Sequence, residues 1–213
     1  MDAAPRRAAS ALRLIAITDS LRDGMQGLAS RARRAAEGGV TMIQLRLREE
    51  SARTLVDVAR TLRAAVPLIP LIVTSRADVA MAAGAQGVHL GSDDMEAGAV
   101  RRIAPPDFLI GVSVGDHADV ARAHGADYVA IGPVFATGAG SLAGAALGLG
   151  RFEELARQCG LPAVAVGGVS VENAGAIMRC GANGLAVISA LFAASDPTQA
   201  ARALRDAQDA IGS

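Results

Sequence analysis

The chain has 213 residues and a formal net charge of zero at neutral pH. It therefore lacks the basic field that attracts nucleic acid or anionic lipid, and we expect neither as a partner. No apolar run approaches the roughly 18 residues that span a bilayer, so no membrane segment is predicted.

Hydrophobic residues make up 51% of the chain and aromatic residues 2%. Such a core must be built from Val, Ile, Leu and Ala, which is typical of a parallel sheet wrapped in helices. The cysteines, Cys159 and Cys180, lack metal-binding spacing and indicate thiols in a reducing compartment. We expect a cytoplasmic protein with a flexible tail over residues 1–11 and one domain over residues 12–213.

Short apolar runs alternate with amphipathic segments along this domain. The runs predict strands at 12–19, 40–46, 70–75, 87–91, 108–114, 128–135, 163–169 and 184–190. The segments between them predict helices at 24–37, 51–66, 78–84, 96–103, 150–158, 171–180 and 197–211. This alternation without a linker predicts a closed (β/α)8 TIM barrel. An open doubly wound sheet is the alternative, although the first strand ends without a glycine-rich dinucleotide fingerprint.

The connections carry several cap and loop signals. Asp19 or Ser20 is expected to cap the first helix, and Ser51 the second. The pair Asp93-Asp94 either caps the helix that follows or holds Mg²⁺ at the barrel mouth. The Gly/Ala-rich segment from Ala136 to Gly148 is of a length that usually forms a lid or is disordered.

Small residues end the last two predicted strands. Gly167 and Gly168 leave backbone amides uncovered by side chains, and Ser189 adds a hydroxyl. Bare amides beside a helix start form an anion site, and in TIM barrels the loops after strands seven and eight are where phosphate usually binds. The pattern predicts a small-molecule phosphate ligand.

All 21 basic residues counted in the chain are arginine. Schiff-base catalysis, which many phosphate-binding barrels use, requires a lysine amine and is therefore excluded. Arg46 and Arg48, two apart at the end of the second predicted strand, point the same way.

Several segments, in order across residues 14–197, resemble the thiamine phosphate synthase and TenI-type thiazole tautomerase family. They are residues 40–48, 87–91 with Asp94, 111–113, 127–135, 166–169 and 186–189. The resemblance implies a TIM barrel that binds a thiazole phosphate at its mouth. It places that phosphate on Gly168 and on the amides of Ile188 and Ser189.

The same resemblance implies a second half of the site in synthases, which join the thiazole to a pyrimidine released from its pyrophosphate with Mg²⁺. Their Gln-x-Arg-x-Lys element corresponds to Gln44, Arg46 and Arg48, so arginine replaces the lysine. Asp94 matches a metal-binding aspartate, and Ser113 matches a serine near the pyrimidine.

This chain departs from the synthase pattern on the pyrophosphate side. Synthases have Asn-Asp after strand three, where Thr74 and Ser75 stand here. Their Thr-x-Thr-Lys after strand six keeps only Thr137. Each lost contact could cost on the order of 3 kcal/mol in stabilising a departing pyrophosphate.

These departures favour a tautomerase, which moves a proton to aromatise the thiazole and needs no cofactor. The tautomerase histidine corresponds to Pro133 here, so His117 is the nearest candidate acid/base, with Arg46, Arg48 and Ser113 as further catalytic candidates. The alternatives are a divergent Mg²⁺-dependent synthase and a non-catalytic thiazole or thiamine phosphate binder. A sugar-phosphate epimerase would need a His/Asp metal cluster that three histidines hardly supply. A homodimer is left open by the alanine-rich helices.

Overall fold

The computed structural model describes residues 10–137 and 145–210. Eight parallel strands close into one barrel in sequence order, from β1 beside β2 to β8 beside β1. The strands are β1 (Leu14–Ile17), β2 (Met42–Leu45), β3 (Leu71–Thr74), β4 (Gly87–Leu90), β5 (Leu109–Val114), β6 (Tyr128–Ile131), β7 (Ala163–Val166) and β8 (Gly184–Val187). The predicted TIM barrel is confirmed.

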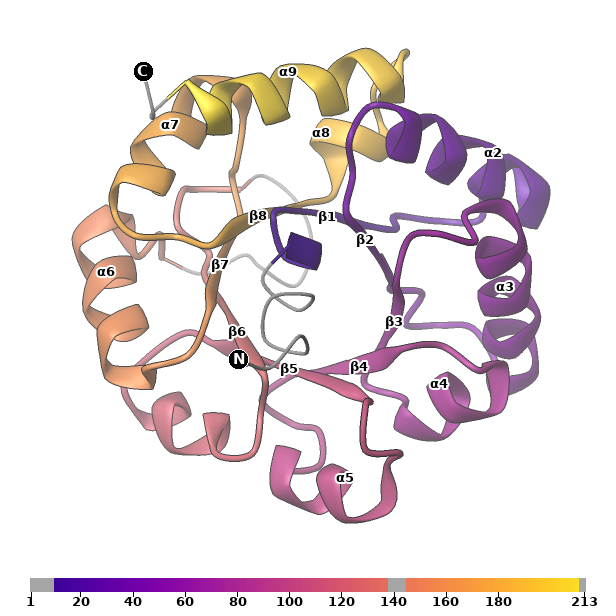
Figure 1. Cartoon of the computed structure of the whole chain (residues 1–213), viewed down its shortest axis with the longest axis horizontal. Coiled ribbons are helices and arrows are strands. Elements are labelled where there is room, and N and C mark those ends of the chain that lie inside the picture. The colour runs from indigo at the N-terminus through magenta and orange to yellow at the C-terminus, as the bar shows by residue number, and fades with distance from the viewer. Residues whose placement is uncertain (1–9, 138–144, 211–213) are drawn as a thin grey trace.

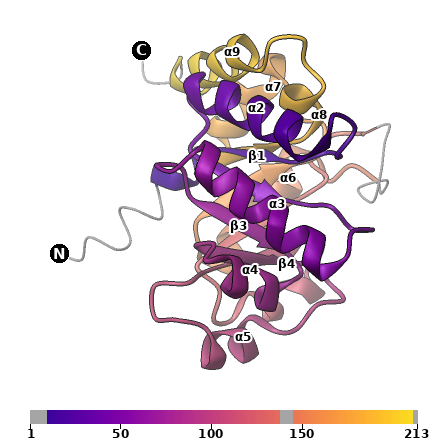
Figure 2. The ribbon, with the colours of Figure 1, turned by 90° about the vertical axis from the view of Figure 1, so that its right-hand side faces the viewer.

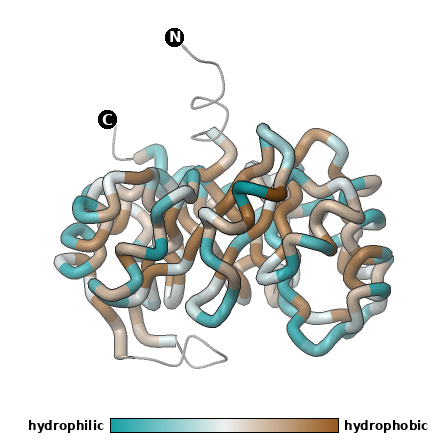
Figure 3. Tube along the Cα trace, turned by 90° about the horizontal axis from the view of Figure 1, so that it is seen from below, coloured by the Kyte–Doolittle hydropathy of each residue, from teal (hydrophilic) through white to brown (hydrophobic). Residues whose placement is uncertain are grey.

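Helices surround the barrel as an outer ring (Figure 1). They are α2 (Gly24–Glu37), α3 (Ala52–Ala65), α4 (Ala77–Ala83), α5 (Ala97–Ile103), the 3-10 helix η1 (Ala118–Ala123), α6 (Gly148–Cys159), α7 (Val171–Arg179), α8 (Ser189–Phe192) and α9 (Pro197–Asp209). Apolar and hydrophilic stretches alternate along them, as expected for helices with one buried face (Figure 3). No helix in the described part of the chain has the length and apolar character needed to cross a membrane.

Two apolar clusters divide the core by the alternation of strand side chains. The larger cluster lies between the strands and the helices and includes Leu14, Ala16, Ile43 and Leu45. The smaller fills the barrel interior and consists of Leu12, Ile15, Ile17, Met42, Ile72, Tyr128, Val164 and Ala186. Because strand parity separates the clusters, the side chain of any strand residue can be assigned to the inside or the outside of the barrel.

The amino end of the barrel is closed by the start of the described chain (Figure 2). Leu12 is fully buried in the interior cluster, and Thr41 Oγ1 donates to the carbonyl of Ala11 at 2.8 Å. Residues 1–9, most of the predicted tail over 1–11, lie outside the described residues. Ligands must therefore enter at the opposite end, where the strands finish at their carboxyl ends.

The structure differs from the predicted elements mainly at strand ends. β6 ends at Ile131 instead of residue 135, because Pro133 has no amide hydrogen for the ladder. β8 ends at Val187, and Ser189 opens the short helix α8. The η1 helix was not predicted; the Asp116 and Asp119 carboxylates hold its start by accepting from the amides of Ala118 and Gly115.

Cap predictions were confirmed in one place and wrong in others. Ser51 caps α3 by accepting from the Thr54 amide at 3.1 Å. Neither Asp19 nor Ser20 caps α2, whose N-cap is Asp23. The Asp19 carboxylate pairs instead with Arg22 at 3.2 Å and Arg31 at 3.4 Å, so it is engaged by side chains and not by the helix amides. Cys159 and Cys180 are free, half-buried thiols.

Candidate functional site

A row of polar side chains lines the inside of the barrel at the carboxyl ends of β2 to β5. The members of this polar row are Gln44, Thr74, His89 and Ser113, one from each strand. Gln44 Nε2 donates to Thr74 Oγ1 at 3.0 Å, and Thr74 is the register partner of His89. The row adjoins the apolar interior cluster, because Gln44 is the register partner of both Ile17 and Ile72.

His89 is the best-connected member of the polar row. Its Nδ1 lies 3.0 Å from the Tyr128 hydroxyl and its Nε2 lies 3.0 Å from Ser113 Oγ. Burial lowers the pKa of His89 to about 4, against a smaller opposing effect of the Asp94 charge. Burial also raises the pKa of Tyr128, so the imidazole is neutral and the phenol protonated at pH 7.

Tyr128 reaches His89 because the neighbouring strand leaves space for its ring. A Cβ on Gly111 would lie 2.1 Å from Tyr128 Cζ. Gly111 and Tyr128 are register partners on β5 and β6, so the ring lies across the glycine. The Gly111-Val112-Ser113 segment thus delivers both the space for the tyrosine and the serine at the other end of the histidine.

Two arginines follow the end of β2 beside the polar row. The backbone of Arg46 is fixed by Thr18, whose Oγ1 accepts from the Arg46 amide at 2.8 Å. Arg46 is half-buried and Arg48 exposed. Burial, and secondly the positive charge of Arg48, lower the pKa of Arg46. An anion at this position would offset the repulsion between the two cations.

The turn after β7 presents backbone amides to the open end. Gly167 and Gly168 have φ values of +89° and +64°. A Cβ atom added to Gly167 would lie 2.5 Å from Pro133 Cβ, and one added to Gly168 would lie 2.7 Å from Phe135 Cβ. Asn173 Nδ2 donates to the Gly168 carbonyl at 2.8 Å, which turns that carbonyl toward α7. The backbone conformation and the close approach of the segment after β6 both require glycine here.

The chain after β8 lies next to this turn, because β7 and β8 are paired. Ile188 is the N-cap of α8 and Ser189 its first residue, and the Ser189 side chain is exposed. Arg22 Nη2 donates to the Phe192 carbonyl at 2.6 Å, so the loop after β1 fixes the end of α8. The predicted phosphate residues Gly167, Gly168, Ile188 and Ser189 are thus brought together.

Asp94 lies in the loop after β4 and is held in place from two directions. Its Oδ2 accepts from the Gly91 amide at 2.6 Å. Arg122 Nη2 donates to the carbonyls of Gly91 and Asp94, at 2.9 and 3.3 Å. Glu96, not Asp94, is the N-cap of α5. The predicted capping alternative was therefore wrong, because the carboxylate is engaged within its own loop.

The oxygen donors at Asp94 fit a Mg²⁺ ion that the protein coordinates only in part. Within residues 10–137 and 145–210, no group of three or more His, Cys, Asp or Glu is placed to hold a metal. Mg²⁺ is commonly bound by one or two carboxylates together with substrate phosphate oxygens and water. Asp94, with the exposed Asp93 beside it, fits a Mg²⁺ that a bound pyrophosphate completes.

Comparison with known proteins identifies the family. A family model described as thiamine monophosphate synthase matches residues 14–191. The chain belongs to this family. It is 44% identical to the thiamine-phosphate synthase of Azorhizobium caulinodans over 198 residues, which cover 91% of this chain and 93% of that one. It is 48% identical to the thiamine-phosphate synthase of Methanoculleus marisnigri over 179 residues, covering 82% and 85%.

Solved structures give the same result. The thiamine phosphate pyrophosphorylase from Pyrococcus furiosus superposes with a TM-score of 0.85 at 34% identity, covering 96% of this chain and 98% of that one. A 3-hexulose-6-phosphate synthase superposes with a TM-score of 0.72 at 24% identity, covering 92% and 99%, and shares the fold. Membership of the thiamine monophosphate synthase family makes this chain an enzyme of thiamine biosynthesis.

One predicted residue of this family member lies away from the others. His117 Nδ1 contacts Gln158 Oε1 at 2.8 Å and Nε2 lies 3.4 Å from Glu154 Oε1, both on α6. The imidazole is exposed in the helix layer and does not join the polar row. The polar row, Arg46, Asp94 and the glycine turn all lie at or just after the carboxyl ends of strands, whereas the His117 side chain lies against α6.

Thr137, in the segment between β6 and α6, is half-buried. Of the loop from Ala136 to Gly148 that was predicted to form a lid or to be disordered, residues 138–144 lie outside the described residues.

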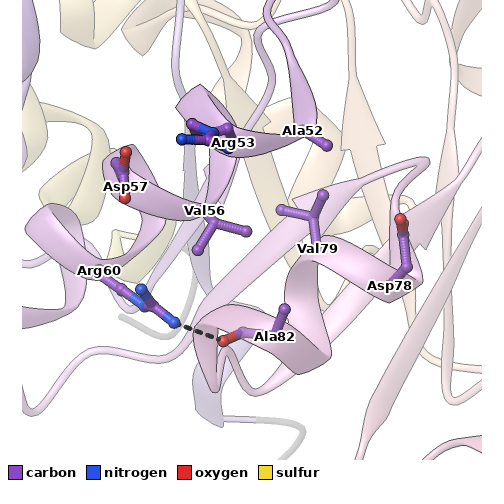
Figure 4. Close-up of a pocket in the computed structure, with 8 residues that line it drawn as sticks. All are labelled: Ala52, Arg53, Val56, Asp57, Arg60, Asp78, Val79 and Ala82. Carbon is purple, nitrogen blue, oxygen red and sulfur yellow. Dashed lines mark hydrogen bonds between the residues drawn. The ribbon is translucent and has the colours of Figure 1, made fainter.

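Two surface grooves lie in the helix layer, outside the barrel. One, of about 420 Å³, lies between α3 and α4 and is lined by Ala52, Arg53, Val56, Asp57, Arg60, Asp78, Val79 and Ala82. Arg60 reaches across it to the Ala82 carbonyl (Figure 4). The other, of about 410 Å³, lies between α2 and α3. Both are seams in the helix layer.

Three residues that support the site were not predicted from sequence. Tyr128 is the sole tyrosine, and a buried phenol implies a partner. Asn173, three residues after Ser170, completes a capping box at the start of α7. Arg122 holds the Asp94 loop from η1, and no local pattern indicates that contact.

Proposed function

We propose that this chain is a thiamine-phosphate synthase, the alternative to the tautomerase that the sequence favoured. It would join a thiazole phosphate to the methylene carbon of a pyrimidine, from which pyrophosphate departs. The observation that carries the proposal is that the glycine turn and the residues suited to pyrophosphate follow strands on different sides of the barrel mouth, which would make two anion subsites. The glycine turn follows β7, whereas Arg46 follows β2 and Asp94 follows β4.

Two separated subsites suit a reaction between two phosphorylated molecules. In the closed barrel β7 is three strands from both β2 and β4. The amides of Gly168 and Ser189 would bind the thiazole phosphate. Arg46 and Arg48 would bind the pyrophosphate on the other side. A tautomerase acts on a single phosphorylated molecule and needs only one subsite.

The chain's own residues can be given roles in this reaction. Gln44, held by Thr74, and Ser113 would hydrogen-bond the pyrimidine ring and orient its methylene carbon. The thiazole nitrogen supplies the electron pair of the new C–N bond, and the pyrophosphate leaves with the electrons of the old C–O bond. Arg46 and Arg48 would stabilise the charge on the leaving group, with Thr137 on the facing side.

Mg²⁺ at Asp94 would supply further neutralisation of the pyrophosphate. The Gly91 amide positions the Asp94 carboxylate for it. This chain lacks lysine, so arginine must provide every side-chain cation on the pyrophosphate side. A guanidinium group also binds phosphate oxygens in pairs, which suits it to this replacement.

The tautomerase has weaker support. It requires a general acid/base at the mouth. His117 faces α6, and His89 has both ring nitrogens within hydrogen-bond reach of neighbours. The relatives described above are named as synthases. Ser75, where the synthase pattern has aspartate, is the observation that still favours it.

The test is to mix the purified protein with thiazole phosphate, pyrimidine pyrophosphate and Mg²⁺. We expect thiamine phosphate and pyrophosphate in equal amounts, and no product after chelation of the metal. If thiazole phosphate alone raises the melting temperature but no product forms, the synthase proposal fails and the phosphate site stands. A proton-exchange assay on the non-aromatic thiazole isomer would then test the tautomerase.

A further inference from the structure

The Tyr128–His89–Ser113 chain runs from the barrel core to its mouth. Tyr128 is fully buried, His89 is 5% exposed, and Ser113 is half-buried at the open end. Each link is 3.0 Å long. A hydrogen-bond chain with a single open end transmits the orientation of its buried donors to the group at that end.

The direction of donation along these hydrogen bonds follows from the hydrogens available. Among the described residues, His89 Nδ1 is the hydrogen-bond partner of the Tyr128 hydroxyl. The phenol has one hydrogen, and leaving it unpaired in the core is costly. The hydroxyl therefore donates to Nδ1, which must carry a lone pair. A neutral imidazole then has its proton on Nε2.

The proton on Nε2 determines what Ser113 can do. Nε2–H donates to Ser113 Oγ, so the serine oxygen accepts within the protein. Its own hydrogen is then free to point into the mouth. With the other tautomer, Nε2 would accept the serine proton and Ser113 could offer only lone pairs to a ligand.

We infer that His89 is a positioning residue, fixed by Tyr128 in the Nε2–H tautomer, and that it makes Ser113 a hydrogen-bond donor to the bound heterocycle. The chain thereby selects a ligand atom with a lone pair, such as an unprotonated ring nitrogen. The statement about the ligand rests on the proposed synthase function. The tautomer of His89 and the direction of hydrogen-bond donation do not depend on that function. The low pKa of His89 agrees, because an imidazolium would remove the acceptor for Tyr128.

The tautomer can be measured without any substrate. In a long-range ¹H–¹⁵N NMR spectrum the protonated and bare imidazole nitrogens are far apart, and the His89 signals are identified by their loss in His89→Gln. We expect a neutral ring with the proton on Nε2, shifting toward a mixture in Tyr128→Phe. A proton on Nδ1, or an imidazolium, in the wild type at pH 7 would overturn the inference.

Kinetics separate positioning from packing. Tyr128→Phe should raise the KM for the pyrimidine substrate about 5-fold, the usual effect of one lost neutral hydrogen bond, with a smaller change in kcat. In a Ser113→Ala background the same substitution should leave KM unchanged, although it lowers the melting temperature equally in both. An equal rise in KM in both backgrounds would mean that Tyr128 acts through packing alone.

The two proposals fail in distinguishable ways. If no thiamine phosphate forms but His89 carries its proton on Nε2, the synthase function fails and the hydrogen-bond chain stands. If product forms while His89 carries its proton on Nδ1, the synthase stands and the direction of the chain is wrong.

Discussion

A Cβ atom on Gly167 would lie 2.5 Å from Pro133 Cβ, closer than two carbon atoms can approach. The segment after β6 is held against this turn by backbone bonds: the Val134 amide donates to the Val166 carbonyl at 2.9 Å and that of Phe135 to the Gly167 carbonyl at 3.1 Å. The residues after β6 and the glycine turn after β7 therefore hold each other in place.

Gly167→Ala should lower the free energy of unfolding by about 2–4 kcal/mol, because it combines a positive φ with a clash against backbone-anchored atoms. Gly160→Ala is the matched control: Gly160 has φ +62° and nothing within 4 Å of the added Cβ, so only the conformational cost of about 1–2 kcal/mol remains. Urea unfolding measures both. Equal losses would show that the contact with Pro133 relaxes freely.

Asp94→Asn should reduce kcat by about 100-fold and weaken the dependence of the rate on Mg²⁺. The fold should survive, because an amide oxygen can still accept from the Gly91 amide. Asp107→Asn, which alters an exposed aspartate just before β5 at the amino end of the barrel, should change kcat by less than about 3-fold. The measurement is the initial rate against Mg²⁺ concentration, and similar rates for both variants would remove Asp94 from the metal site.

Arg46→Gln should weaken the affinity for inorganic pyrophosphate by about 10- to 100-fold, since a charge-assisted hydrogen bond contributes about 1.5–3 kcal/mol. Titration calorimetry at fixed salt measures this effect. Arg33→Gln alters an exposed arginine on α2, in the groove between α2 and α3, and should leave the affinity unchanged. A loss in Arg33→Gln as large as in Arg46→Gln would mean that pyrophosphate binds through general surface charge.

Acid should destabilise the protein through His89. Its pKa is about 4 in the folded state and near 6.5 when unfolded, so between these values the unfolded chain binds more protons. The free energy of unfolding that depends on a neutral His89 is fully present above pH 6.5 and is lost as the pH falls toward 4. The expected loss between pH 7 and pH 5 is about 2 kcal/mol.

Urea unfolding of His89→Gln should remove most of this dependence between pH 7 and pH 5. His124→Gln, which alters an exposed histidine, should retain it. A pH dependence that persists in His89→Gln would assign the acid sensitivity to other groups.

Local sequence patterns were sufficient to predict the order of strands and helices. The apolar runs 163–169 and 184–190 predict buried parallel strands because both faces are hydrophobic, and the structure places β7 and β8 side by side within them. The predicted boundaries were too long at the carboxyl ends, because polar or small residues there continue toward the mouth after the ladder has ended. Composition alone excludes Schiff-base chemistry, because the chain has no lysine.

Resemblance identified the site residues, but only the fold could show which of them meet. Gln44 and Thr74 are 30 residues apart and hydrogen-bond because neighbouring strands share a register. His117 and Asp116 follow β5 as the site residues follow other strands, yet His117 lies against α6. No local pattern indicates which way an irregular loop turns, since that depends on packing between distant elements.

The sequence by itself determined the barrel, the glycine turn and the family, because strand and helix periodicity and backbone freedom are properties of neighbouring residues. The tertiary structure decided the rest. It linked Tyr128, His89 and Ser113 from three strands, held the Asp94 loop through Arg122, and put the glycine turn and Arg46 on different sides of the barrel mouth. These relationships depend on barrel closure and strand register, which set distances between residues far apart in the chain.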